Sequence, residues 1–265
     1  MVDFVNGFTE VYGDPLGYKA SWEAMVNFKD MDATRRTEII SANAQWFEDH
    51  SPIQEKYRKK EVKGVSAKVI NAAILGGDCY PATPIGINLP NADWIRKDYG
   101  SKSVTIQNIT QAYAESSKGN GFIEEFIFRP EDRERITLYG TIGDNMHTDL
   151  HECLGHGSGQ LAPGVKGDEL KQYGSVLEEA RADLFSLYYM ADPKMEELGL
   201  LPDAEVAKAQ YASYISNGMM TQLARVELGK DIEQTHMRNR KMISEWAYEL
   251  GRRENVIEKV VNDRK

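Results

Sequence analysis

The residues best suited to chemistry lie in the segment HECLGH, which runs from His151 to His156. Two histidines and a glutamate are the side chains with which helical zinc peptidases bind a metal and accept a proton. In the usual helical motif the histidines stand at i and i+4, whereas here the second histidine stands at i+5. Because an α-helix turns about 100° per residue, a regular helix would point these imidazoles about 140° apart. A metal site here therefore requires a local change in the helix.

A single-turn π-bulge is the change that we predict, because it absorbs one extra residue and is frequent at functional sites. Gly155 directly precedes His156 and is the residue whose backbone is easiest to distort. We therefore expect the helix to bulge near Leu154–Gly155, which would let His151 and His156 face one ion.

The segment LEEARAD, Leu177 to Asp183, is the best source of a third ligand. Catalytic zinc takes three protein ligands and keeps one position for water. Glu178 and Glu179 project about 100° apart on a helix, so only one of them can bind the metal. If Glu179 is the ligand, Asp183 lies one turn further on the same face and could accept the free N–H of a ligand histidine. Zinc would then retain a net positive charge, and Glu152 is placed to take a proton from its water.

Each motif also has an ordinary interpretation. A His-Glu pair on a helix is common, and EEARAD alone is typical of a solvated helix face. Their occurrence together favours a zinc site, and the glycine-rich GHGSGQL that follows His156 would leave space beside the ion. His147, one turn before His151, could support the site but is expected at the surface. Cys153 is expected to pack in the interior rather than bind metal.

Composition and charge exclude several classes of function. The chain has 265 residues, of which 41% are hydrophobic and 28% charged, and a formal net charge of −9. This acidic balance argues against nucleic-acid binding. The basic run Arg238–Lys241 is interpreted as a solvated helix face or a local substrate clamp. No apolar run reaches the roughly 18 residues of a membrane span. Without a secretory signal, and with Cys79 and Cys153 too few for a disulfide framework, we expect a cytoplasmic protein.

Hydrophobic periodicity predicts a mainly α fold with a few short strands, in one domain over 1–265. A long amphipathic helix is predicted from Ser21 to about His50, and others at roughly 144–156, 170–191, 204–228 and 231–254. Ser66–Leu75 is interpreted as a buried strand, because glycine and proline bracket it. Ser103–Ile109 fits a short strand or the start of a helix. The segment 76–94 is rich in Gly, Pro and Asn and is predicted to be an irregular but ordered loop.

The paired motifs resemble a known family. HECLGH matches the H-E-x-x-G-H signature, and EEARAD the E-E-x-R-A-[ED] signature, of dipeptidyl peptidase III, the M49 metallopeptidases. The segments EVYGDPLG, PIGINLPN and HMRNR are similar to further stretches of that family. Its members are considerably longer, two-lobed enzymes with the substrate cleft between the lobes. This chain resembles the middle of such a protein, the largely helical zinc-bearing lobe. We therefore expect an excised domain whose natural partners include the missing lobes.

Carried over by position, the resemblance implies a complete catalytic site. It implies zinc ligands His151, His156 and Glu179 and the general base Glu152. We further expect Glu178 and Asp183, on the same predicted helix as Glu179, to support the ligands. It implies that Glu10, Asn88 and Asn91 bind the free amino terminus of a peptide, that Tyr12 and His236 stabilise the oxyanion, and that Arg240 contacts the peptide further along. Without the resemblance, ordinary loop, turn or surface positions would be the interpretation of Glu10, Tyr12, Asn88, Asn91 and His236.

The expected function is a zinc exopeptidase that releases dipeptides from the amino terminus of short oligopeptides. One alternative is a non-catalytic, metal-stabilised module that binds peptides. Another is an endopeptidase with the same metal chemistry, which would need no residue to bind a free amine.

Overall fold

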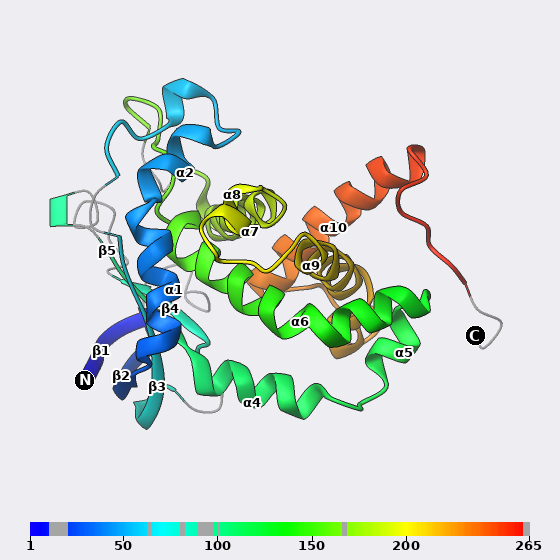
Figure 1. Ribbon diagram of the computed structural model, residues 1–265, viewed down its shortest axis with the longest axis horizontal. Helices are drawn as coiled ribbons and strands as arrows, with labels where there is room; N and C mark the ends of the chain where they lie inside the picture. The colour runs from blue at the N-terminus through cyan, green and yellow to red at the C-terminus, as the bar shows by residue number, and fades with distance from the viewer. Residues whose placement is uncertain are drawn as a thin grey trace.

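The computed structural model describes residues 1–10, 21–62, 65–79, 83–89, 98–99, 101–165 and 169–261. Within these ranges a five-stranded sheet lies at one side of a group of helices, as Figure 1 shows. The expected mainly α class with a few strands is confirmed. No helix in the described ranges combines the length and apolar character needed to cross a bilayer.

The sheet has the strand order β1-β2-β3-β5-β4, with β4 at one edge. Its strands are β1 (Val2–Glu10), β2 (Ser21–Lys29), β3 (Val65–Gly77), β4 (Gly86–Leu89) and β5 (Ser101–Ile106). Strands β3 and β5 are parallel, and the other neighbouring pairs are antiparallel. One core gathers on the sheet from Val5, Met25, Ile70, Cys79, Ile87, Val104 and Ile106.

The helices form the larger part of the molecule. They are α1 (Met31–Ala42), α2 (Ala44–His50), α4 (Gln107–Ser117), α5 (Phe122–Phe126), α6 (Pro130–Leu150), α7 (Gly174–Met190), α8 (Lys194–Glu197), α9 (Glu205–Ser216) and α10 (Thr235–Arg253). Short 3-10 turns are η1 (Glu55–Tyr57), η3 (Lys171–Tyr173) and η5 (Leu223–Arg225), and π turns are η2 (His151–Gly155) and η4 (Asn217–Thr221). The main core contains Phe47, Leu150 and Tyr189 and brings together α2, α6 and α7. The Tyr189 hydroxyl also donates to the carbonyl of Phe47.

Helix α1 packs against β3 of the sheet and also meets the π turn η2 (Figure 1). The Thr34 hydroxyl donates to the carbonyl of Val69 on β3 at 3.1 Å. The same hydroxyl oxygen accepts from the Val69 amide at 3.2 Å. A buried hydroxyl therefore satisfies two polar groups at the contact between helix and sheet.

The predicted long helix from Ser21 to His50 is wrong over its first nine residues, which form β2. Trp22 and Phe28 are exposed while Met25 is buried, so the strand carries apolar residues on both faces. A segment apolar on both faces fits the helical and the extended periodicity alike. Asp30 then caps α1 by accepting from the Ala33 amide at 2.9 Å.

Other predicted elements agree with the structure more closely. Ser66–Leu75 is a strand within β3, but Ile74 is 63% exposed, so its outer end is not buried. Ser103–Ile109 was expected to be a short strand or the start of a helix, and it contains both: β5 ends at Ile106 and α4 starts at Gln107. The predicted loop over 76–94 contains the short strand β4. Helix α6 begins at Pro130, well before the predicted start at 144, and proline suits the first position of a helix.

Candidate metal centre

The HECLGH segment forms the π turn η2, which continues helix α6. The amide of His156 donates to the carbonyl of His151 at 3.1 Å, five residues back. The two imidazole rings lie 4.7 Å apart with nearly perpendicular planes. The predicted bulge is therefore confirmed, and it brings both histidines to the same side of the helix.

We expected a glycine at position 155 because its backbone is easy to distort, but the structure gives a different reason for it. Its backbone stays helical and does not enter the left-handed region. A Cβ atom added at Gly155 would lie 2.8 Å from both Cα and Cβ of Ala182 on α7. The glycine is required because α7 packs directly against the π turn, and this contact carries Glu179 up to the histidines.

The carboxylate of Glu179 lies between the two imidazoles. Its Oε2 is 3.2 Å from Nε2 of His151, and its Oε1 is 3.9 Å from Nε2 of His156. A tetrahedral zinc ion with bonds of about 2.0–2.2 Å would hold its ligand atoms about 3.3–3.5 Å apart. The two distances lie on either side of this spacing, and imidazole nitrogen and carboxylate oxygen are donors that zinc accepts. Glu152 lies beside them, with a carboxylate oxygen within 4.8 Å of the histidine nitrogens.

Asp183 supports His151 from the protein interior. Its Oδ1 is 2.8 Å from Nδ1 of His151 and 2.9 Å from Nε2 of His147. The Tyr214 hydroxyl donates to Oδ2 of Asp183 at 2.7 Å. A carboxylate at Nδ1 keeps the hydrogen on that nitrogen and leaves the Nε2 lone pair for a metal. The expectation that His147 is a surface residue is wrong, because α7 covers this face of α6 and leaves His147 5% exposed.

Glu178 supports His156 at the rim of the site. Its Oε1 lies 3.0 Å from Nδ1 of His156 and accepts from Nη2 of Arg181 at 2.6 Å. Arg181 also donates through Nη1 to the carbonyl and hydroxyl of Ser158, both at 2.7 Å. Burial raises the pKa of Glu178, but the His156 hydrogen bond and the Arg181 charge outweigh it and lower this pKa to about 2.

The pKa values of Glu179 and Asp183 are also lowered. Burial raises the pKa of Glu179, yet its hydrogen bonds with His151 and His236 bring that pKa far below the ordinary value. The pKa of Asp183 is lowered in the same way, with His147 and His151 outweighing burial. Burial lowers the pKa of His151, but Asp183 and Glu179 raise it further than burial lowers it. A metal ion that binds Nε2 of His151 would therefore release a proton that the ring holds in the metal-free protein.

Two carboxylates, Glu152 on the π turn and Asp149 near the end of α6, face the sheet. A Cβ atom added at Gly86 on β4 would lie 2.6 Å from Oε1 of Glu152, so the Glu152 carboxylate rests against that strand. Asp149 accepts from Nε of Arg36 at 2.6 Å and from the Thr105 hydroxyl at 3.2 Å. Burial raises the pKa of Asp149 to about 6, against the opposing effect of Arg36.

Helix α10 brings His236 to the same centre. Its Nε2 lies 3.3 Å from Oε2 of Glu179, while its side chain is 38% exposed. Arg240 lies further along α10, where Nη1 donates to the side-chain oxygen of Asn217 at 3.3 Å. Its guanidinium carbon is 5.9 Å from the centre of the Tyr214 ring. Arg240 thus contacts the network behind Asp183, whereas His236 faces the candidate ligands.

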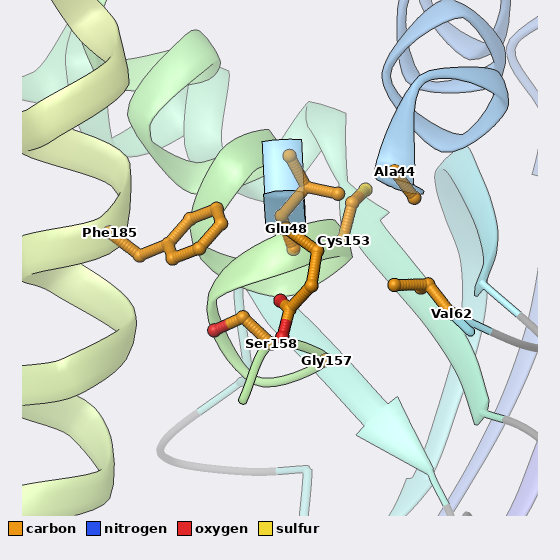
Figure 2. A pocket seen from close by; sticks show the side chains of 8 residues that line it. Ala44, Glu48, Val62, Cys153, Gly157, Ser158 and Phe185 are labelled. Carbon is orange, nitrogen blue, oxygen red and sulfur yellow. The ribbon is translucent and has the colours of Figure 1, made fainter. Parts of the chain in front are cut away.

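A small cavity lies behind the π turn, and Figure 2 shows its lining. Cys153 borders it and is 3% exposed, which confirms the expectation that this thiol packs in the interior. Glu48 also borders it and accepts from the amides of Lys59 at 2.6 Å and Gly159 at 2.9 Å. The cavity is lined by Ala44, Glu48, Val62, Cys153, Leu154, Gly157, Ser158 and Phe185, none of which is a candidate metal ligand. Glu48 therefore anchors the glycine-rich segment after His156.

Comparison with known proteins decides the family. The sequence model of peptidase family M49 matches residues 1–169, a range that includes HECLGH. The chain belongs to peptidase family M49. It is similar to dipeptidyl peptidase 3 of Rattus norvegicus, with 30% identity over 162 residues, 61% of this chain and 21% of that protein. It is also 28% identical to Nudix hydrolase 3 of Arabidopsis thaliana over 223 residues, 81% of this chain and 28% of that protein.

A solved M49 relative supports the fold as well. The structure of dipeptidyl peptidase III from Caldithrix abyssi aligns with 94% of this chain at a TM-score of 0.74 and 26% identity. The alignment covers 47% of that solved chain. The present chain thus spans less than half of the solved relative, and 28% and 21% of the two curated relatives. It represents a part of the M49 architecture that contains both signature motifs.

Four residues assigned by the M49 resemblance have side chains that the structure does not describe. Tyr12 and Asn91 are outside the described residues. Glu10 ends β1 and Asn88 pairs with Ser103 on β5, but only their backbones are described. The binding of a peptide amine by these residues stays a prediction.

The site also contains residues that sequence reasoning did not select. Tyr214, Arg36 and Asp149 enter through tertiary packing, and no local spacing identifies them. His147 did carry a signal, since it stands four residues before His151 and thus faces the same side of α6.

Proposed function

We propose that this chain carries the zinc-binding and proton-transferring part of an M49 exopeptidase, which releases dipeptides from the amino terminus of short oligopeptides. The observation that carries the proposal is the convergence of His151, His156 and Glu179. Each histidine directs Nε2 towards Glu179 and keeps Nδ1 on a separate carboxylate. Histidines oriented in this way are typical of catalytic metal sites.

His151, His156 and Glu179 would hold the zinc ion. Two neutral imidazoles and one carboxylate are a donor set that catalytic zinc uses, with a position left for water or substrate. When bound, zinc would polarise the scissile carbonyl and lower the pKa of the attacking water.

Glu152 would act as the general base. It would accept one proton as the water oxygen adds to the carbonyl carbon, and then give that proton to the leaving amine as the C–N bond breaks. The contact between its carboxylate and Gly86 limits where Glu152 can point. His236 would donate from Nε2 to the carbonyl oxygen as negative charge develops there. Tyr12 would be a second donor to the same oxygen, as the family resemblance implies.

Glu10, Asn88 and Asn91 would bind the free amine, and Arg240 the peptide beyond the cleaved bond. Strand β4 supports this arrangement because it carries both Gly86, which touches Glu152, and Asn88. Two residues of an extended strand span roughly 7 Å, which is also the length of two extended substrate residues. One strand could thus set the distance between the bound amine and the general base.

A purely structural role for zinc has less support. Structural zinc is usually enclosed by four protein ligands, often thiolates. Cys79 belongs to the core on the sheet and Cys153 to the core between the helices, and both are buried there. Neither thiol is among the groups whose ligand atoms converge within the described residues.

The test is hydrolysis of dipeptidyl-arylamide substrates by a full-length protein that contains this chain, with and without Glu152→Gln. We expect turnover to fall by about 100-fold or more, with zinc content unchanged. His151→Ala is the matched control and should lose zinc as well as turnover. Activity that survives both Glu152→Gln and exhaustive chelation would contradict the mechanism.

For the isolated chain we expect zinc binding but weak turnover. The reason is that the chain spans less than half of a solved relative, so part of the substrate cleft would be missing. Isothermal titration with a dipeptide and a tetrapeptide, made beside the turnover measurement, separates peptide binding from catalysis. Unimpaired cleavage of N-acetylated peptides after Glu10→Ala would instead favour an endopeptidase.

A further inference from the structure

Gln234 stands directly before α10 and uses one side-chain amide for two contacts. Its Oε1 accepts from the backbone amide of Met237 at 2.7 Å, which caps the first turn of the helix. Its Nε2 lies 2.9 Å from Nδ1 of His236. The same side chain therefore touches both the helix backbone and the histidine that faces the candidate metal centre.

The helix cap determines the direction of the second hydrogen bond. A backbone N–H is a donor, so the atom that meets the Met237 amide must be the oxygen of the Gln234 side chain. The NH2 group then faces His236, and since it cannot accept, Nδ1 of His236 must be the acceptor. A neutral imidazole carries one hydrogen, which here must be on Nε2.

The other side of the ring favours the same tautomer. Nε2 of His236 is 3.3 Å from Oε2 of Glu179, and the Glu179 side chain is 3% exposed. An ionised carboxylate oxygen accepts hydrogen bonds and would repel a nitrogen lone pair. Gln234 and Glu179 are on different elements; the hydrogen bond from Gln234 requires the hydrogen on Nε2 of a neutral ring, and the approach to Glu179 favours it.

We propose that Gln234 is a positioning residue, which holds His236 in the Nε2–H tautomer so that a donor faces the reacting carbonyl oxygen. This inference rests on the proposed function, in which His236 stabilises the oxyanion. With the opposite tautomer, Nε2 would present a lone pair to the developing negative charge and would oppose the reaction. The cap of α10 and the direction of the catalytic donor are thus set by one amide group.

The direct test uses the metal-free chain labelled with ¹⁵N at histidine. Two-bond ¹H–¹⁵N correlation spectra distinguish the two neutral tautomers, and a His236→Gln variant assigns the His236 signals among the five histidines. We expect the Nε2–H form in the wild-type chain and a mixture of tautomers in Gln234→Asn and Gln234→Ala. An Nδ1–H form in the wild type, or an unchanged tautomer in both variants, would overturn the proposal.

Gln234→Asn separates positioning from helix capping. Asparagine is among the best capping residues, so this variant should keep the thermal midpoint of the wild type. Its amide is one methylene too short to maintain the contact with Nδ1 of His236. Gln234→Ala removes both contacts and should lower the midpoint. Both variants should lower kcat about 10-fold or more, with little change in KM.

A double-mutant cycle in the zinc-loaded, full-length protein completes the test. If Gln234 acts through His236, Gln234→Asn should not lower kcat any further once His236 is alanine. An equal loss of kcat with and without His236 would overturn the proposal. The tautomer measurement does not depend on peptidase activity, so it can fail or succeed independently of the proposed function.

Discussion

Nδ1 of His151 and Nδ1 of His156 each meet a carboxylate of α7, at 2.8 and 3.0 Å. The surroundings of the two carboxylates differ. Asp183, beside His151, is 2% exposed and is shared with His147 and Tyr214. The Glu178 side chain, beside His156, is 40% exposed and pairs with Arg181.

This difference separates two ways of orienting an imidazole. At Asp183 the charge is buried among hydrogen-bonding side chains, so the carboxylate is part of the protein core. At Glu178 the charge is balanced by a guanidinium at the rim, where solvent screens it. Asp183 should therefore determine whether the site folds, and Glu178 should adjust how tightly the site binds metal.

The largest expected effect is the loss of stability when the carboxylate of Asp183 is removed. Asp183→Ala leaves His147, His151 and Tyr214 without their shared acceptor, and should lower the free energy of unfolding by about 3–5 kcal/mol. Urea denaturation of the metal-free chain measures this loss. Glu178→Ala is the matched variant at the rim and should lose at most about 1 kcal/mol. Equal losses in the two variants would remove the distinction between core and rim.

The contact that brings α7 to the π turn should give the next largest effect. In Gly155→Ala the new methyl would overlap Ala182, so the two elements must separate, at a cost of about 1–3 kcal/mol. Metal affinity should fall as well, because Glu179 would move away with α7. Gly140→Ala on α6 is the control, since its methyl would meet Ile136 at an ordinary 3.5 Å. That variant should be about 0.5–1 kcal/mol more stable, and a destabilised control would weaken the argument.

Removing the rim charge should alter metal binding more than folding. Glu178→Gln keeps the size of the side chain but weakens the hold on His156, and zinc affinity should fall about 10-fold. Competition with a chelator of known affinity measures this change. Glu197→Gln, in an exposed ion pair with Lys194, is the control and should leave the affinity unchanged. A wild-type affinity in Glu178→Gln would show that His156 needs no carboxylate.

The smallest effect on stability is expected at an ion pair of the sheet. This pair involves neither histidine nor metal, so it shows what a carboxylate contributes without them. Asp3 lies 2.8 Å from Nζ of Lys102 and 3.2 Å from Nζ of Lys68. Burial raises the pKa of Asp3, but the two lysines outweigh it and lower that pKa below the ordinary 3.8. A lowered pKa in the folded state stabilises the protein above the unfolded value, and this contribution is lost as the pH falls below 3.8.

Asp3→Asn should therefore be less stable than the wild type near neutral pH, by at most about 1 kcal/mol. The two proteins should converge as the acid limit is approached. Urea denaturation over a series of pH values tests this, and a difference that grows towards acid would reverse the sign of the argument.

The sequence predicted best what local spacing determines. The i+5 separation of His151 and His156 demands an altered helix turn if both are to face one ion, so the sequence alone predicts the π turn. Residues 21–29 were mispredicted because β2 has apolar residues on both faces, and only its pairing with β1 and β3 selects the extended form. His147 was misplaced because its burial depends on which face of α6 is covered by α7.

The π turn η2 also restricts how the HECLGH segment can change over evolution. No substitution converts five-residue spacing into four, since a codon must be deleted. Because the π turn absorbs one extra residue, such a deletion would turn η2 into a regular helical turn and leave the chain after it in register. The two histidines would then stand at i and i+4 and would still share one side of the helix. The contacts of Ser158 with Arg181 and of Gly159 with Glu48 would be kept, so the two spacings are alternative ways to pair the histidines that only a deletion or an insertion interconverts.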